Sequence, residues 1–153
     1  PQYASAYYNR GNSKIKLNDN YGAISDYTKA IEINPQYADA YTNRGNRKFD
    51  LKDYYGAISD YTKAIEINPN DADAYFNRGN RKLNIKDYYG AISDYTKVIE
   101  INPNDADAFY NRGISKKNIG DLNGACFDWR QTFFISSNSE AAKFLRNECS
   151  YAY

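Results

Sequence analysis

Residues 21–35 of this chain read Tyr-Gly-Ala-Ile-Ser-Asp-Tyr-Thr-Lys-Ala-Ile-Glu-Ile-Asn-Pro, and the same letters return at residues 55–69. They return again at residues 89–103, with Val98 in the place of Ala30 as the only change. A second marker, Asn-Arg-Gly, keeps the same interval of 34 residues and occurs at positions 9–11, 43–45, 77–79 and 111–113. Self-similarity at a fixed period of this size indicates an array of stacked repeats rather than one globular fold.

Each repeat predicts two helices, which in the first unit cover about residues 4–17 and 20–33. The second helix carries apolar residues at spacings of three and four, which form one stripe along a helix: Ala23, Ile24, Tyr27, Ala30 and Ile31. An Asp that can cap free backbone N–H groups precedes each second helix: Asp19, Asp53, Asp87 and Asp121. Asp71 and Asp105 can cap the following first helices. The Asn-Pro pair at residues 34–35, 68–69 and 102–103 should end the second helix, because the residue before proline is pushed out of the helical region.

A glycine recurs in the middle of every first helix: Gly11, Gly45, Gly79 and Gly113. A glycine there costs about 1 kcal/mol relative to alanine. We therefore expect two helices to approach closely at this point, with the alanines of the second helix as the partners: Ala23, Ala57, Ala91 and Ala125.

An arginine precedes each of these glycines: Arg10, Arg44, Arg78 and Arg112. An unpaired buried charge is very costly. Our hypothesis is that each arginine pairs with an aspartate of the second helix, in its own unit or in the preceding one: Asp26, Asp60, Asp94 and Asp128. The alternative is an arginine that reaches solvent over its aliphatic stem.

Composition excludes several classes of function. Lys and Arg number 20 against 19 Asp and Glu, so the net charge of +1 lacks the cationic excess of a nucleic-acid-binding protein. No apolar run approaches the roughly 20 residues that span a bilayer, so we expect a soluble protein without a membrane partner, with the cytoplasm favoured. Histidine is absent, and no nucleophile–base pair, phosphate loop or distinct carboxylate cluster occurs. We therefore expect no enzymatic activity, no cofactor and no metal site.

The two cysteines, Cys126 and Cys149, lie near the C-terminus. They could form one disulfide, but buried free thiols are the favoured interpretation.

The two ends of the chain differ. Residues 1–4 repeat residues 35–38, so the chain begins in phase with the repeats and is interpreted as a segment of a longer protein. Its uncapped N-terminal face could support end-to-end self-association. At the other end, residues 136–139 should break the helix, and residues 140–152 predict a last helix that closes the stack. That helix has Ala141, Ala142, Leu145 and Cys149 on its apolar side.

These features together resemble the tetratricopeptide repeat family, whose first helix carries a large aromatic residue, Leu-Gly and Tyr, and whose second carries Ala, an aromatic residue and Pro. The first unit holds Tyr7, Arg10-Gly11, Lys14, Ala23, Tyr27 and Pro35 at these places. The fourth holds Phe109, Arg112-Gly113, Lys116, Ala125 and Trp129, with Ser137 instead of proline. Arg in place of Leu and Lys in place of Tyr are the departures in every unit.

The resemblance implies an all-α, right-handed superhelical solenoid of antiparallel helix pairs, with four units and a C-terminal capping helix. Within one array of residues 1–153, the expected repeats are 4–37, 38–71, 72–105 and a degenerate 106–139, followed by the capping helix 140–153.

The resemblance also implies a peptide-binding groove on the first helices, which line the concave side of the superhelix in this family. Amide side chains there offer donors and an acceptor to an extended backbone: Asn9, Asn12, Asn43, Asn46, Asn77, Asn80 and Asn111. Beside them we expect Tyr8, Thr42, Phe76 and Tyr110 to contact side chains of the ligand, and Asp39, Asp73 and Asp107 to set its charge preference. The alternative is that the asparagines solvate a polar helix face or bond across neighbouring helices.

We therefore expect a protein–protein interaction module that binds an extended, neutral or basic segment; the alternative is a structural scaffold or self-assembling array. The family's clamp for acidic C-terminal peptides does not match, because its cationic places hold Tyr8, Asp73 and Asn77. A peptide ending in Glu-Glu-Val-Asp should not bind tightly. Repeats that read RNA are a further class, which the near-neutral charge and the acidic positions disfavour.

Overall fold

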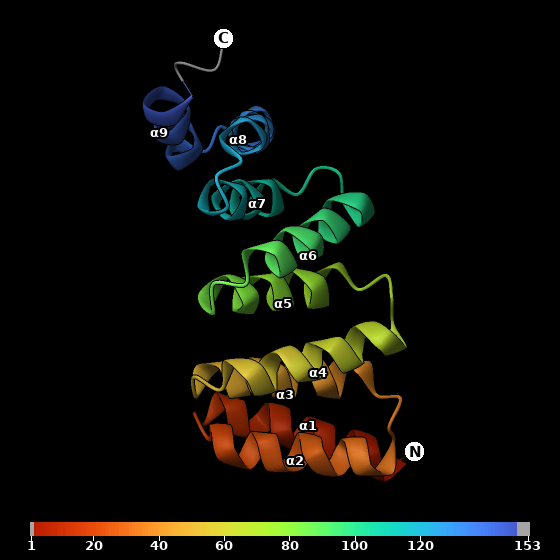
Figure 1. Cartoon of the computed structure of the whole chain (residues 1–153). Helices are drawn as coiled ribbons and strands as arrows, with labels where there is room; N and C mark the ends of the chain where they lie inside the picture. Colours follow the sequence, from red (N-terminus) through yellow and green to blue (C-terminus); the bar gives the residue numbers. More distant parts are fainter. Residues whose placement is uncertain (1, 150–153) are drawn as a thin grey trace. The chain divides into compact units, whose positions relative to one another are not determined.

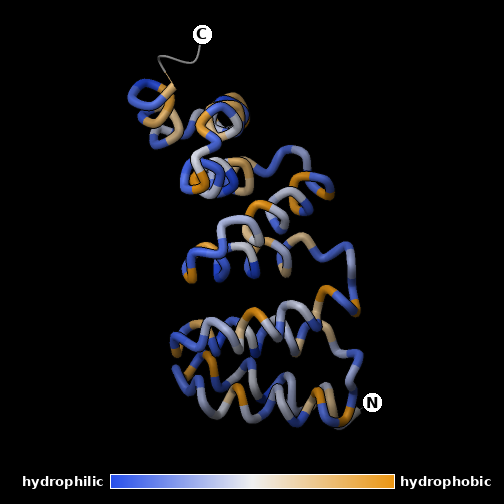
Figure 2. The backbone as a smooth tube through the Cα atoms, viewed as in Figure 1, coloured by the Kyte–Doolittle hydropathy of each residue, from blue (hydrophilic) through white to orange (hydrophobic). Residues whose placement is uncertain are grey.

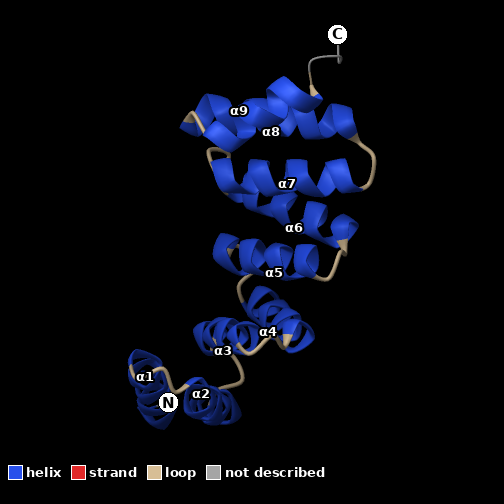
Figure 3. Ribbon diagram, turned by 90° about the vertical axis from the view of Figure 1, so that its left-hand side faces the viewer, coloured by secondary structure: helices blue, strands red, loops and turns tan. Residues whose placement is uncertain are grey.

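The structure is a computed structural model that describes residues 2–149. Within this range the secondary structure consists of nine α-helices joined by short loops (Figures 1 and 3). Their bounds are α1 Gln2–Lys16, α2 Asn20–Ile33, α3 Ala38–Asp50, α4 Tyr54–Ile67, α5 Ala72–Asn84, α6 Tyr88–Ile101, α7 Ala106–Asn118, α8 Leu122–Ser136 and α9 Ser139–Glu148. The predicted all-α solenoid class and the two helices per repeat are confirmed. None of the described helices is long and apolar enough to cross a membrane.

The helix ends follow the repeated polar residues. The carboxylate of Asp19 accepts a hydrogen bond from the backbone N–H of Gly22 at 2.8 Å, and the equivalent bond caps α4, α6 and α8. Asp71 and Asp105 cap α5 and α7 through the N–H groups of Ala74 and Ala108. The second helices α2, α4 and α6 end directly before the Asn-Pro pairs. These predictions are confirmed, and they succeed because a cap depends on only a few neighbouring residues.

The chain divides into two compact units, with the boundary between Ala74 and Tyr75, inside α5. In the first unit consecutive helices from α1 to α4 pack against one another, as do α6 to α9 in the second. Figure 2 shows hydrophobic residues recurring along these helices between hydrophilic ones. In the first unit, Ala30 and Ile31 of α2 and Ala40 of α3 form a buried cluster that Tyr7, Tyr8, Tyr37 and Tyr41 surround.

The mid-helix glycines do face a closely packed second helix, but the nearest neighbour is an aromatic ring and not alanine. A Cβ atom at Gly11 would lie 2.7 Å from Cε1 of Tyr27, and a Cβ atom at Gly113 would lie 2.5 Å from Nε1 of Trp129. Tyr61 and Tyr95 are the nearest side chains at the two glycines between. The predicted alanine partner occurs at Gly45, where the carbonyl oxygen of Ala57 would lie 3.3 Å from the Cβ atom, but at each of the four glycines the nearest atoms belong to an aromatic ring.

The arginine hypothesis is confirmed, and each pair forms within one repeat. Nη2 of Arg44 lies 2.6 Å from Oδ1 of Asp60, and Nε donates to Oδ2 at 2.9 Å. The same aspartate also receives Nζ of Lys48 at 2.8 Å. All four repeats have this triad, which consists of Arg10, Lys14 and Asp26; Arg44, Lys48 and Asp60; Arg78, Lys82 and Asp94; and Arg112, Lys116 and Asp128.

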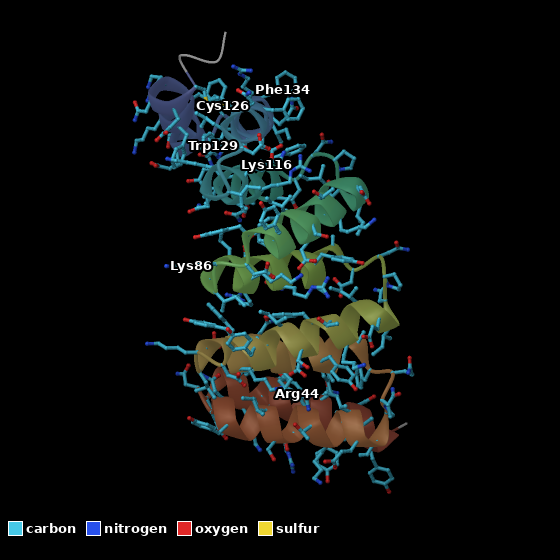
Figure 4. The ribbon with its side chains drawn as sticks, in the orientation of Figure 1. Arg44, Lys86, Lys116, Cys126, Trp129 and Phe134 are labelled. Carbon is cyan, nitrogen blue, oxygen red and sulfur yellow. A yellow bond between two sulfur atoms is a disulfide. The ribbon has the colours of Figure 1, made fainter. Side chains whose placement is uncertain are left out.

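The C-terminal helix α9 is fixed to α8 by a covalent bond. Cys126 and Cys149 form a disulfide with a Cα–Cα distance of 5.8 Å, so the preference for free thiols is wrong. The reason is geometric: the left-handed Ser137 (φ 52°) and the cap residue Asn138 reverse the chain, and the reversal brings the end of α9 beside the start of α8. Figure 4 shows Cys126 and Trp129 on the side of α8 that faces α9, whereas Phe134 points away from it. Residues 150–153 of the predicted helix lie outside the described range.

Candidate peptide-binding site

The first unit contains a hollow of about 510 Å³ beside the N-terminal half of α3. One wall comes from the first helices α1 and α3, and the other from the turn between α4 and α5 and the first residues of α5. The lining residues are Tyr8, Asp39, Thr42, Asn43, Asn68, Asn70, Asp71, Ala72 and Asp73. All of them precede the boundary at Ala74, so the hollow belongs to one compact unit.

Local hydrogen bonds fix the turn that forms the second wall. Asn68 ends α4, and its side-chain oxygen accepts the backbone N–H of Asn70 at 3.3 Å. Asp71 accepts the N–H of Ala74 at 3.0 Å and starts α5. The wall is therefore held by the same residues that end one repeat and begin the next.

The hollow brings together five of the predicted site residues: Tyr8, Asp39, Thr42, Asn43 and Asp73. Asn9, Asn12 and Asn46 belong to the same unit but do not line it. The remaining predicted residues lie in the second unit: Phe76, Asn77, Asn80, Asp107, Tyr110 and Asn111.

The asparagines of one predicted row bond to the second helix of their own repeat. The buried Tyr27 donates its phenol hydrogen to Oδ1 of Asn12 at 2.7 Å. Tyr61 and Asn46, and Tyr95 and Asn80, form the same bond at 2.6 Å and 2.7 Å. In the fourth repeat Ile114 and Trp129 replace both partners of the pair. The replacement removes this bond from the fourth repeat, where the buried indole Nε1 of Trp129 has no hydrogen-bond partner among the described residues.

A second row connects neighbouring first helices. Nδ2 of Asn43 donates to the hydroxyl oxygen of Tyr8 at 2.9 Å and lies 3.4 Å from Oδ1 of Asn12. Nδ2 of Asn111 lies at the same distance, 3.4 Å, from Oδ1 of Asn80. The Tyr27 hydroxyl, which is protonated at neutral pH, holds Asn12 in place through the hydrogen bond between them, and burial raises the pKa of Tyr27 to about 12. Asn43 and Tyr8 therefore stand at the hollow as parts of an ordered network.

The charged residues that line the hollow are all acidic. Three carboxylates, from Asp39, Asp71 and Asp73, line it, and its lining includes no lysine or arginine. Asp39 and Asp73 are exposed to solvent. The hydroxyl oxygen of Thr42 is buried without a hydrogen-bond partner among the described residues. The site thus offers negative charge and a tyrosine ring to a ligand.

Comparison with family models identifies the repeats. The model described as tetratricopeptide repeat matches residues 4–37, and the model described as TPR repeat matches residues 45–82 and 85–120. The chain belongs to the tetratricopeptide repeat family. A search of curated proteins found no match.

Several solved structures have the same fold. A crystal structure of MamA protein is 22% identical with a TM-score of 0.86, over 95% of this chain and 89% of that chain. The structure titled MamA 41-end, from Desulfovibrio magneticus RS-1, is 19% identical with a TM-score of 0.88, over 95% and 82%. The first tetratricopeptide domain of Spaghetti (RPAP3), bound to the HSP90 peptide SRMEEVD, is 28% identical with a TM-score of 0.74, over 78% and 94%.

Four lining residues of this tetratricopeptide hollow were missed by the sequence analysis: Asn68, Asn70, Asp71 and Ala72. Two of them, Asn68 and Asp71, were assigned only to ending or capping a helix. The signal was present, because Asn-Pro-Asn-Asp at residues 68–71 replaces the Asn-Pro-Gln-Tyr of residues 34–37 and adds a carboxylate to the turn.

Proposed function

We propose that this tetratricopeptide array is a protein-interaction module whose first unit binds an extended, neutral or basic segment of a partner protein. The observation that carries the proposal is the acidic hollow beside α3. The tetratricopeptide fold itself supports interaction or scaffolding, and we propose no catalytic role for it.

Charge favours a cation in the ligand. The carboxylates of Asp39 and Asp73 are exposed, and no basic residue of the lining neutralises them. A lysine or arginine side chain of the ligand can form ion pairs with both carboxylates, so its own charge does not remain unpaired. An acidic segment meets like charges, which cost affinity. The SRMEEVD peptide bound by the RPAP3 domain is therefore a poor fit here.

Polar side chains can hold the ligand backbone beside the cation. Asn43 is positioned by Tyr8 and Asn12, so little conformational entropy is lost when it bonds a peptide group. Thr42 lines the hollow beside Asn43, and its buried hydroxyl oxygen has no hydrogen-bond partner among the described residues. The asparagines of the predicted ladder that lie in the second unit, Asn77, Asn80 and Asn111, stay proposed backbone contacts within that unit.

The test compares two short peptides that differ only in charge, Ac-Ser-Gly-Asn-Lys-Asn-Gly-Ser-amide and its Lys→Glu counterpart, together with SRMEEVD. Amide resonances of the full chain are followed by NMR. The lysine peptide should shift Asp39, Thr42, Asn43 and Asp73, and the two acidic peptides should not. Asp39→Asn with Asp73→Asn should weaken binding about tenfold, as expected for the loss of two charge contacts.

A matched control removes the same charge elsewhere. Glu32 and Glu66 are exposed, each paired with a lysine three residues away, and neither lines the hollow. Glu32→Gln with Glu66→Gln should leave binding of the lysine peptide unchanged. Equal weakening by both double variants, or tighter binding of SRMEEVD, contradicts the proposal.

One observation favours the alternative of a structural scaffold. Tyr21, Tyr55 and Tyr89 occupy the same position of three repeats, and each ring is about three-quarters exposed, at 76%, 74% and 73%. A recurring exposed aromatic residue can support association. Light scattering against concentration separates the alternatives: a chain that stays monomeric and binds the lysine peptide supports the interaction module.

A further inference from the structure

The first two repeats differ at a pair of positions that borders the acidic hollow. In the first repeat the ring of Tyr8 packs on the ring of Tyr37, with 4.9 Å between the ring centres. The residues 34 positions later are Thr42 and Asp71, so the second repeat lacks both rings. Thr42 and Asp71 both line the hollow. The second repeat therefore has a hollow and an added carboxylate where the first repeat has two stacked rings.

The other repeats keep an aromatic ring at the position of Thr42. Phe76 occupies this position in the third repeat and Tyr110 in the fourth. Each packs on another ring of its own unit: the ring centres of Phe76 and Tyr95 lie 5.8 Å apart, and those of Tyr110 and Phe144 lie 6.2 Å apart. Thr42 is thus the member of this row without a ring, and its short side chain leaves space for a flat group.

A comparison within the chain isolates the effect of that ring. The turn Asn-Pro-Asn-Asp-Ala-Asp at residues 68–73 returns letter for letter at residues 102–107. Every asparagine and aspartate that lines the hollow has the same residue 34 positions later, whereas Thr42 becomes Phe76. We therefore expect the turn at residues 68–73 to accept a ligand group for which the turn at residues 102–107 has no room.

The chain shows which flat group combines with a carboxylate and an aromatic ring. Nε and Nη2 of Arg44 donate to the two carboxylate oxygens of Asp60 at 2.9 Å and 2.6 Å. Cζ of Arg44 lies 5.5 Å from the ring centre of Tyr41, and the equivalent distances in the other repeats are 5.1, 5.5 and 5.4 Å. A guanidinium is planar, charged and presents its donors as a fork, so it can contact a ring and a carboxylate together.

The acidic hollow contains the same two kinds of partner. Tyr8 is held by its contact with Tyr37 and by the hydrogen bond that its hydroxyl oxygen accepts from Asn43. Asp71 is held by the bond that Oδ1 accepts from the N–H of Ala74. A carboxylate accepts more than one hydrogen bond, so Asp71 can also bond a ligand. Both partners are in place before a ligand arrives, which lowers the entropy cost of binding.

We propose that the acidic hollow selects an arginine of the partner segment over a lysine. The guanidinium occupies the space beside Thr42, donates to the carboxylate of Asp71 and contacts the ring of Tyr8. Asp39 and Asp73 add negative charge to the same hollow. A lysine supplies the charge without the planar fork, so it binds more weakly. This inference rests on the proposed function and names the residue that the hollow recognises.

The test uses three peptides that differ in one side chain: Ac-Ser-Gly-Asn-Lys-Asn-Gly-Ser-amide and its Lys→Arg and Lys→citrulline counterparts. The lysine peptide has the charge without the planar group, and the citrulline peptide has the planar group without the charge. NMR titration of the full chain measures each affinity. The arginine peptide should bind at least about fivefold more tightly than the lysine peptide and at least about tenfold more tightly than the citrulline peptide.

The repeated turn is an internal control for these titrations. The arginine peptide should shift the amide signals of Asn70 and Asp71. The signals of Asn104 and Asp105, which have the same sequence around them, should stay unchanged because Phe76 stands in the equivalent place of Thr42. Equal shifts of both turns would show that the peptide binds acidic turns in general, which contradicts a site defined by Thr42.

The matched protein variants are Thr42→Phe and Thr42→Val. Thr42→Phe introduces the ring that Phe76 provides in the third repeat, so it should fill the space and weaken binding of the arginine peptide at least about tenfold. Thr42→Val keeps the size of the side chain and removes a hydroxyl group whose oxygen has no hydrogen-bond partner among the described residues, so binding should stay unchanged. The Tm of each variant verifies that the fold is intact.

The outcomes separate this inference from the proposed function. Equal affinities of the arginine and lysine peptides overturn the selection of arginine and leave the proposed function standing. Undiminished binding of the arginine peptide to a folded Thr42→Phe protein also overturns it, because the guanidinium then lies elsewhere. If neither basic peptide binds, the proposed function fails together with the inference. Should Thr42→Phe lower the Tm, the comparison of the three peptides on the original chain decides alone.

Discussion

Each repeat buries one carboxylate between two cations that replace the leucine and the tyrosine of the family pattern. Asp60, for example, receives Arg44 and Lys48, and the exposed fraction of the Asp60 side chain is 4%. The two departures are therefore one coupled change, since an arginine or lysine at these places requires the aspartate. The guanidinium also lies over the ring of Tyr41, with 5.5 Å from Cζ to the ring centre. Arg44 therefore makes an ion pair, hydrogen bonds and a contact with an aromatic ring at the same time.

We predict that Asp60→Ala lowers the free energy of unfolding by about 3–5 kcal/mol, because it leaves two cations in a largely buried place without a counter-charge. Arg10→Leu should cost much less than Arg44→Leu, since Arg10 is 60% exposed and Arg44 15% exposed. Urea denaturation measures all three variants. An Asp60→Ala protein as stable as the original contradicts a structural role for the triad.

Tyr27 makes stability depend on alkaline pH. Burial raises its pKa to about 12, from an ordinary value of 10.0. Its contribution is fully present below pH 10, and it is lost as the pH rises toward 12, because the unfolded chain releases the proton first. The slope attributable to this residue reaches at most about 1.4 kcal/mol per pH unit. Tyr27→Phe should remove this slope. The measurement is the free energy of unfolding of both proteins between pH 9 and about 12. If the two values fall in parallel as the pH rises, the slope does not come from Tyr27.

Hydrogen-bond partners are the part of the site that sequence could not predict. An amide side chain can bond a ligand, a neighbouring helix or water with the same atoms. From the sequence, Asn12 and its equivalents in the other repeats were therefore predicted to contact a ligand. In the structure, Asn12 accepts the hydroxyl hydrogen of the buried Tyr27. The pairing with Asp26 was predictable, because a buried arginine has few acceptable partners. The acidic hollow could not be predicted from the net charge of +1, since it depends on which few residues share one wall.

The helices themselves were predictable almost to the residue, because caps, Asn-Pro ends and apolar stripes are local and occur repeatedly. Helix α2 covers Asn20–Ile33, as predicted. The attachment of α9 was not predictable, since the repeat ends there and no second copy shows the geometry. Its position depends on the reversal at Ser137, the disulfide, and Phe144 stacked on Trp129 with 4.4 Å between ring centres.

We predict that removing the disulfide by Cys126→Ala with Cys149→Ala lowers the free energy of unfolding by about 3 kcal/mol, because the bond closes a loop of 23 residues. Hydrogen exchange of α9 should accelerate, while exchange in α1–α4 stays as it was. Addition of a reducing agent to the original protein should reproduce the change. If α9 keeps its protection in the reduced protein, the stack of Phe144 on Trp129 is sufficient to hold it.

At the scale of the whole chain, stability should be a sum of local terms, because a helix in a repeat array contacts mainly its sequence neighbours. In the first unit these contacts run from α1 to α4, and in the second from α6 to α9. A large loss in one unit should therefore leave the other folded. Trp129, fully buried in α8, provides the test, because its removal costs about 3–5 kcal/mol where it packs.

We predict that Trp129→Ala accelerates hydrogen exchange in α7, α8 and α9 and leaves α1–α4 protected. The lysine peptide should still bind, since its hollow ends at Asp73 in the first unit. Tyr27→Ala is the mirror variant: it should loosen α1 and α2, impair the hollow through Asn12 and Asn43, and spare α9. Equal loss of protection in every helix for both variants would mean that the array unfolds as one cooperative block, and the binding site would then depend on the stability of the entire chain.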